Sequence, residues 1–150
     1  MSLQDKVMAE MKAAMKAKDS EKLEALRSVK SAILLANTES SAKDGLTEDE
    51  ELKILQKLVK QRKESAAIYR EQNRADLAEP EEKQAAVIES FLPEQLSEAE
   101  IEAKVDEVIA KTGATGMQDM GKVMGMASNE LAGKADGKTI STIVKKKLSK

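Results

Sequence analysis

Apolar side chains recur every three or four residues along almost the whole of this 150-residue chain. The first segment carries Leu3, Val7, Met11 and Ala14, which share one face of a helix but not one face of a strand. Charged residues make up 35% of the chain, and the remainder is dominated by residues that favour helix. The pattern therefore predicts an all-α fold without a β-sheet.

Short polar signals divide this pattern into seven expected helices. Thr47 with Glu50 has the spacing of a capping box, in which each side chain bonds a free amide at the helix start. Pro80 is expected in the first turn of the fourth helix, where its missing N–H costs nothing, and Pro93 is expected to stop that helix at Leu92. Further caps are expected at Asp76 with Glu79, Ser97 with Glu100, Thr115 with Gln118, Gly113 and Asp136. The seven helices are expected over residues 3–17, 20–36, 48–73, 77–92, 98–112, 116–132 and 137–148.

A domain boundary is expected just after Pro93. The predicted architecture is two helical bundles, a longer four-helix N-terminal domain over residues 1–94 and a small three-helix C-terminal domain over residues 95–150. Charge is also unevenly distributed, because residues 1–100 carry 16 basic and 21 acidic side chains and residues 101–150 carry 9 and 6. A polyanion should therefore prefer the C-terminal third.

Histidine and cysteine are both absent from the chain. Their absence excludes disulfides, thiol chemistry, zinc sites of the Cys/His kind, haem ligation by histidine and every nucleophile that depends on an imidazole base. We therefore expect no catalytic residues, no metal site and no cofactor. Tyr69 and Phe91 are the only aromatic residues, too few for a base-stacking platform, so a bound nucleic acid would be recognised by its backbone and shape.

Targeting signals are not apparent in the chain. No apolar run approaches the ~20 residues of a membrane span, and the N-terminus alternates charge with Met and Ala where a secretion signal would be apolar. These features predict a cytoplasmic protein that does not bind membranes.

Three other clusters have an ordinary explanation beside a functional one. The acidic run after Thr47 suits the positive end of a helix dipole better than a metal site. Ser40, Ser41 and Lys43 are residue types found in amidase chemistry, but they lack the glycine-rich surroundings of such a site. The lysine row Lys53, Lys57, Lys60 and Lys63 is expected on a solvated helix face, paired with Glu64, Glu71 and their neighbours.

The segment GKADGK, residues 133–138, is the leading candidate site. Gly133 is expected to end one helix and Asp136 to start the next, so Lys134 and Lys138 would flank a turn with free amides that can meet an anion. An ordinary helix corner is an equally good interpretation. The surrounding residues 120–150 hold seven lysines and two acids. The candidate RNA-contacting residues are Lys134, Lys138, Lys145, Lys146, Lys147, Gly133, Asp136, Gly121 and Lys122.

Two glycines interrupt the sixth expected helix. Gly121 and Gly125, in the segment MGKVMG, each cost ~1 kcal/mol relative to alanine inside a helix. Glycines four residues apart let another backbone come close, which serves either helix packing or contact with an RNA backbone. Because Met120 and Met124 lie beside them, packing is the favoured interpretation.

Five motifs together resemble the GatB/YqeY family, and specifically its free-standing YqeY-like proteins. They are LTEDEEL (46–52), VKQRKES (59–65), LPEQLSEAEI (92–101), MGKVMG (120–125) and GKADGK (133–138), and the resemblance spans nearly the whole chain. It implies an all-helical fold of two bundles. In larger relatives a similar module is the tail of the B subunit of the Asp/Glu-tRNA amidotransferase, or is appended to some bacterial glutaminyl-tRNA synthetases, and serves tRNA binding. The residues that correspond to this tail are Gly121, Val123, Met124, Gly133, Lys134, Ala135 and Asp136.

The resemblance leaves three hypotheses about function. The first is a non-catalytic tRNA-binding module of a bacterial type, active in translation, that binds tRNA weakly by itself and does not bind DNA. The second is a protein-interaction module that docks on an amidotransferase or an aminoacyl-tRNA synthetase. The third is a component of a carbon–nitrogen ligase with glutamine as amido donor, active only in complex, because nothing here resembles the catalytic domain of the B subunit.

The isolated chain is expected to hydrolyse neither glutamine nor ATP. It has no His or Cys nucleophile system and no phosphate-binding loop of the Walker type. Release of glutamate and of phosphate, measured on the purified protein, tests this. Turnover that persists through repurification and exceeds that of a mock preparation would contradict it.

Overall fold

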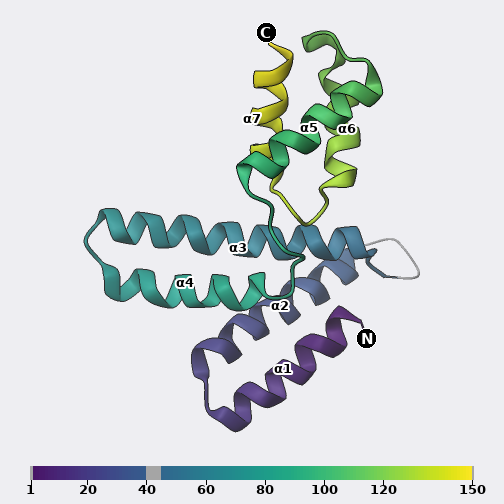
Figure 1. The fold of residues 1–150 in the computed structure, drawn as a ribbon. Coiled ribbons are helices and arrows are strands. Elements are labelled where there is room, and N and C mark those ends of the chain that lie inside the picture. Colours follow the sequence, from purple (N-terminus) through teal and green to yellow (C-terminus); the bar gives the residue numbers. More distant parts are fainter. Residues whose placement is uncertain (1, 40–44, 150) are drawn as a thin grey trace. The chain divides into compact units, whose positions relative to one another are not determined.

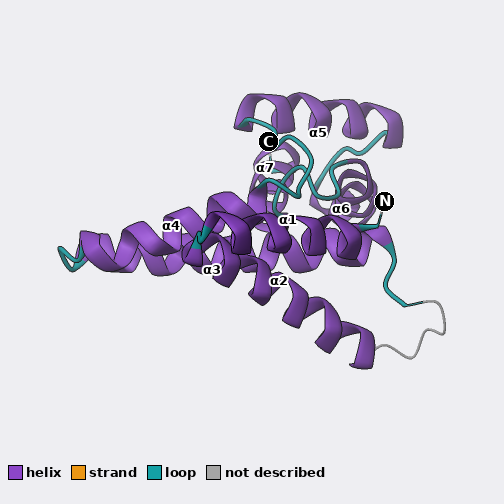
Figure 2. Cartoon of the chain, turned by 90° about the horizontal axis from the view of Figure 1, so that it is seen from below, coloured by secondary structure: helices purple, strands orange, loops and turns teal. Residues whose placement is uncertain are grey.

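The computed structural model describes residues 2–39 and 45–149 (Figure 1). The described residues form helices and loops without a strand, which confirms the all-α prediction (Figure 2). Ser40, Ser41 and Lys43 lie outside the described residues. The helices are α1 (Leu3–Ala17), α2 (Ser20–Glu39), α3 (Glu48–Glu71), α4 (Ala75–Glu89), α5 (Glu98–Thr112), α6 (Met120–Glu130) and α7 (Gly137–Leu148), with a 3-10 turn η1 (Met117–Asp119) before α6.

Capping boxes begin three of these helices. At α3 the hydroxyl of Thr47 accepts a hydrogen bond from the Glu50 amide at 3.2 Å, and the Glu50 carboxylate accepts one from the Thr47 amide at 2.8 Å. Each box satisfies amides that a helix cannot bond internally. The predicted boxes of α3 and α5 and the left-handed cap at Gly113 are confirmed, and α1 has a box that the sequence analysis missed. The three boxes are Ser2 with Asp5, Thr47 with Glu50 and Ser97 with Glu100.

The predicted cap of α4 by Asp76 and Glu79 is wrong. The helix begins at Ala75, and the Asp76 carboxylate accepts two hydrogen bonds, each of 3.0 Å, from the guanidinium of Arg74. This pairing lowers the pKa of Asp76 below its usual value. A neighbouring arginine therefore takes the carboxylate that was expected to bond the backbone.

Two further predictions about α4 are wrong. Pro80 lies inside the helix beyond the first turn, so the carbonyl of Asp76 lacks the donor that another residue at position 80 would supply. The helix also ends at Glu89 and not at Leu92. The next residues form a tight turn, in which the Leu92 amide donates to the Glu89 carbonyl at 3.0 Å, because Pro93 disfavours helical geometry in the residue before it.

The predicted cap of α6 by Thr115 and Gln118 is also wrong. Asp119 accepts a hydrogen bond from the amide of Thr115 at 3.0 Å, which closes the loop that precedes the helix. The 3-10 turn Met117–Asp119 follows this loop, and α6 begins only at Met120. The helix also ends at Glu130, so Gly133 lies in the following turn and does not cap it, and α6 is shorter at both ends than the sequence pattern indicated.

Residues 1–92 form the first of two compact units. Two helical hairpins, α1/α2 and α3/α4, compose it, and α2 lies at its centre because it contacts the other three helices (Figure 1). Leu26, Val29 and Ile88 are fully buried between them. The core is Val7, Ala14, Ala25, Leu26, Val29, Ile33, Leu55, Val59, Ala85 and Ile88.

Residues 93–150 form the second unit, in which α5, α6 and α7 all contact one another. The segment before α5 is tied into this unit, since the Leu96 amide donates to the Lys134 carbonyl at 3.0 Å and the Gln95 side chain donates to the Gly133 carbonyl at 2.6 Å. The core of this unit shares no residue with the first. It consists of Ile101, Val105, Val108, Val123, Ala127, Leu131, Ala135, Ile140, Ile143, Val144 and Leu148.

Separate cores should make the units respond separately to cavity-forming substitutions. Val105→Ala is expected to destabilise residues 93–150 by about 1–3 kcal/mol, and Val29→Ala to destabilise residues 1–92 by a similar amount, because both valines are fully buried. Native-state amide hydrogen exchange measures protection in each unit. Equal loss of protection in both units of either variant would contradict the prediction.

Candidate nucleic-acid interface

The corner between α6 and α7 holds the leading candidate residues. Gly133 is buried and has φ +76°, a left-handed geometry that glycine adopts without strain. Asp136 caps α7, as predicted, by accepting a hydrogen bond from the Thr139 amide at 2.7 Å. The side chains of Lys134 and Lys138 are exposed on either side of this cap. The structure thus brings together four of the predicted site residues.

Fewer amides of the corner are free than the sequence suggested. The amides of Lys134 and Ala135 both donate to the Leu131 carbonyl, at 2.9 and 3.3 Å. Within the described chain, the amides of Gly137 and Lys138 in the first turn of α7 have no such acceptor. An anion at this corner would therefore meet lysine side chains and the start of one helix.

A basic stripe extends from the corner along α7. Lys138 and Lys145 are seven residues apart, so they lie two turns apart on the same side of the helix. Lys146 lies beside them, and all three are exposed. The opposite side of α7 carries the apolar residues Ile140, Ile143, Val144 and Leu148, which are buried as predicted.

Lys147 lies on a different side of α7 from this stripe. Its ammonium contacts the carboxylates of Glu102 and Asp106 on α5 at 3.0 and 3.3 Å, and its side chain is 20% exposed. The hydrogen bond to Glu102, followed by that to Asp106, raises the pKa of Lys147. Of the three consecutive lysines, this one is engaged within the protein.

The lysines of α5 are also paired. Lys111 contacts Glu130 and Glu107, each at 3.4 Å, and the hydrogen bond to Glu130 is the main cause of its raised pKa. Lys104 contacts the same two glutamates, at 3.8 and 3.5 Å. The α5 side of the unit therefore carries lysines that acids already neutralise.

The remaining described lysines of the second unit form no ion pair with another described residue. All five belong to α6, the corner or α7, and all five are exposed. We call them the unpaired lysines. They are Lys122, Lys134, Lys138, Lys145 and Lys146.

Gly121 and Gly125 lie on the exposed side of α6. A Cβ added to either glycine would meet no atom within 4 Å in the described structure. The favoured interpretation, packing against another helix of this chain, is therefore wrong, since α6 packs through Val123 and Ala127 on its other side. The backbone of this helix is accessible to a molecule from outside.

The lysine row of α3 serves as a comparison surface. Lys53, Lys57 and Lys60 are exposed and have no ion-pair partner in the part of the chain that the structure describes. Farther along α3, Lys63 pairs with Glu89 of α4 at 3.3 Å and Arg70 pairs with Glu82. The expected pairing with Glu64 and Glu71 is wrong, since Lys63 and Arg70 pair with acids of α4 and the other three lysines pair with no described acid.

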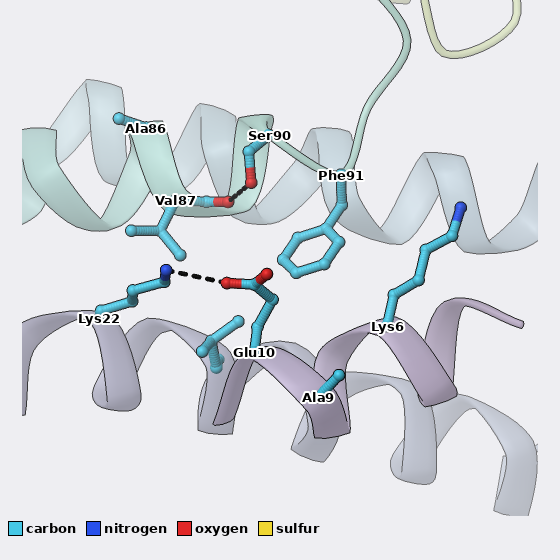
Figure 3. Close-up of a pocket in the computed structure, with 9 residues that line it drawn as sticks. Lys6, Ala9, Glu10, Lys22, Ala86, Val87, Ser90 and Phe91 are labelled. Atoms are coloured by element: carbon cyan, nitrogen blue, oxygen red, sulfur yellow. Dashed lines mark hydrogen bonds and ion pairs between the residues drawn. The ribbon is translucent and has the colours of Figure 1, made fainter. Parts of the chain in front are cut away.

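A hollow of about 740 Å³ lies in the first unit, between α1, α2 and α4 (Figure 3). Glu10 and Lys22 form an ion pair of 2.8 Å within it, which raises the pKa of Lys22. Val87 of α4 and Phe91 of the turn after it face this pair. The hollow has no group of acidic residues placed to hold a metal ion, and the sequence analysis predicted no site residue here.

These features define a class of protein: all-helical, of two units, with a second unit that is basic on its α6/α7 side. A model of the family described as Yqey-like protein matches residues 4–148. The chain belongs to this family, as the sequence resemblance indicated. Among the described residues, no helix has the length and apolar character needed to cross a membrane.

Curated relatives match parts of the chain. One subunit of the glutamyl-tRNA(Gln) amidotransferase of Thermococcus gammatolerans is 42% identical over 73 residues, which cover 46% of this chain and 12% of that larger protein. The protein named altered inheritance of mitochondria protein 41, mitochondrial, is 35% identical over 104 residues in Lachancea thermotolerans and 36% over 118 residues in Vanderwaltozyma polyspora. These alignments cover 68% and 74% of this chain, and 55% and 63% of the two yeast proteins.

Amine reactivity should distinguish the paired from the unpaired lysines. Acylation requires the neutral amine, so the raised pKa of Lys111 and Lys147 is expected to make them react more slowly than Lys138 and Lys145 at pH 8. Trace labelling with acetic anhydride followed by mass spectrometry gives the rate at each position. Equal rates at Lys145 and Lys147 would show that the ion pairs on α5 do not persist in solution.

Proposed function

We propose that this chain is a non-catalytic module that binds tRNA through the unpaired lysines of its second unit. The observation that carries the proposal is the sorting of lysines in that unit: those near α5 are neutralised by acids, and those on α6, the corner and α7 are not. An ammonium without a carboxylate partner is available to a phosphate. The relation to one component of a tRNA amidotransferase supports tRNA as the polyanion.

The unpaired lysines suit the backbone of a folded RNA better than its bases. They are flexible point charges without the bidentate geometry of arginine, and the second unit has no aromatic residue on which a base could stack. Five phosphate contacts give salt-sensitive binding, with a slope of log K against log salt of about −3.5 to −4.5. The overall charge of −2 opposes the encounter, so affinity is modest unless a partner protein adds surface.

A second candidate function is docking on an amidotransferase or an aminoacyl-tRNA synthetase. The relative from Thermococcus gammatolerans supports it, because that protein is named as one component of a multi-chain enzyme. A role as a component of a carbon–nitrogen ligase that is active only in complex remains the third hypothesis. The bacterial type and the cytoplasmic location stay predictions, since two relatives are yeast proteins named as mitochondrial.

Charge reversal at the corner should weaken binding of tRNA. Lys134→Glu with Lys138→Glu removes two phosphate contacts, and each lost contact reduces the magnitude of the salt slope by ~0.7–0.9. The variant should melt like the parent, because exposed lysines contribute within ~0.5 kcal/mol to folding. Filter binding with total tRNA across a salt series measures both affinity and slope.

The matched control is Lys53→Glu with Lys57→Glu on α3, which reverses two lysines that are also exposed and lie outside the proposed interface. This control should bind tRNA nearly as the parent does. If it loses as much affinity as the corner variant, binding follows diffuse charge or the first unit, and the proposed interface is wrong.

A further inference from the structure

The α1/α2 hairpin exposes apolar side chains that nothing in the described structure covers. Met8 on α1 is 42% exposed and Leu34 on α2 is 52% exposed. They line a groove of about 240 Å³ whose floor is formed by the buried residues Val7 and Ile33. Gln4 and Lys30 also line it. We call this feature the Met8–Leu34 groove.

The apolar surface continues along both helices from this groove. Met15 is 54% exposed and lies seven residues after Met8, so it is on the same side of α1, two turns farther on. Met11 and Leu23, which are half-buried, lie between the groove and the end of the hairpin. Methionine adapts to partners of different shape because its side chain is unbranched and flexible. The surface therefore has the length of several helical turns and the side chains of a docking surface.

The charges beside this apolar surface are positive. Lys30 and Arg27 lie on the groove side of α2, and Lys12 lies one turn from Met8 on α1. All three side chains are exposed, and none has an ion-pair partner among the described residues. Three acids of the hairpin are engaged elsewhere, while Glu24 and Glu39 of α2 are exposed and do not line the groove. Glu10 pairs with Lys22, and Glu21 pairs with Lys83 of α4. Asp5 is bonded within the cap of α1.

We propose that the Met8–Leu34 groove binds an amphipathic helix of a protein partner, with Leu, Ile or Val every three or four residues and Asp or Glu along its edges. A groove between two helices accepts the apolar face of a third. The unpaired cations Lys12, Arg27 and Lys30 select acidic edges by charge complementarity. This inference does not depend on RNA binding, because the groove belongs to the first unit and the unpaired lysines to the second.

A protein helix suits this surface better than a lipid membrane does. Three cations are fewer than the ~4–8 that mark a membrane-binding basic cluster. The surface also has no tryptophan, tyrosine or phenylalanine to insert at a lipid interface, and its apolar residues line a groove. Both features favour a partner that fills the groove with side chains.

The test uses the full chain and two fluorescent helical peptides of about 18 residues, which share the same leucine positions. One peptide carries glutamates along its edges and the other carries lysines. Fluorescence anisotropy should show that the acidic peptide binds at least about tenfold more tightly than the basic one at low salt. Leu34→Glu should weaken the acidic peptide about tenfold or more, because it places a carboxylate in the apolar contact.

Leu35→Glu is the matched control, because Leu35 is the next residue of α2, is 60% exposed and does not line the groove. It should bind the acidic peptide as the parent does, and both variants should keep the parent circular dichroism. Equal binding of the two peptides, or equal effects of the two leucine variants, would overturn the proposal. Stronger binding of the protein to vesicles of anionic lipid than to the peptide would overturn it in favour of a membrane as the occupant. Dimerisation of the parent protein that Leu34→Glu abolishes would overturn it in favour of a second copy of this chain.

Discussion

The hydrogen bond from the Thr139 amide to the Asp136 carboxylate fixes where α7 begins, and the surface of the second unit depends on it. A helix that begins at Gly137 turns Ile140, Ile143 and Val144 into the core. The same phase directs Lys147 toward the acids of α5 and leaves the stripe of Lys138 and Lys145 exposed. Burial of these apolar residues holds that phase, because a rotation of α7 by about 100°, the step of one residue, would expose them and lose the sorting of lysines.

Much of the fold could be predicted because its signals are local. Capping boxes and apolar spacing report on residues within one or two turns, and these located α1, α3, α5 and α7 closely. The failures came from competing local partners. Arg74 bonds the carboxylate of Asp76, and Asp119 bonds the amide of Thr115, so neither expected cap forms. Spacing alone does not show which of two possible bonds a short polar side chain makes.

The candidate interface was predictable in composition but not in detail. Counting charge located a basic third of the chain, yet treated Lys145, Lys146 and Lys147 as equivalent. Helical phase could have separated Lys147, since it lies on the flank next to the core. Its partners Glu102 and Asp106 are over 40 residues away in sequence, and only the packing of α5 on α7 brings them near. The outward position of Gly121 and Gly125 likewise follows once Val123 and Ala127 are known to be buried.

The segment that joins the two units is very short. Gln95 and Leu96 are bonded to Gly133 and Lys134, and the tight turn ends at Leu92, so Pro93 and Glu94 alone connect the two bodies. So short a tether keeps any molecule held by one body close to any molecule held by the other, at an effective concentration on the order of millimolar. Under the two proposals made above, such a tether would raise the encounter rate of a tRNA with an acidic helix of a protein partner.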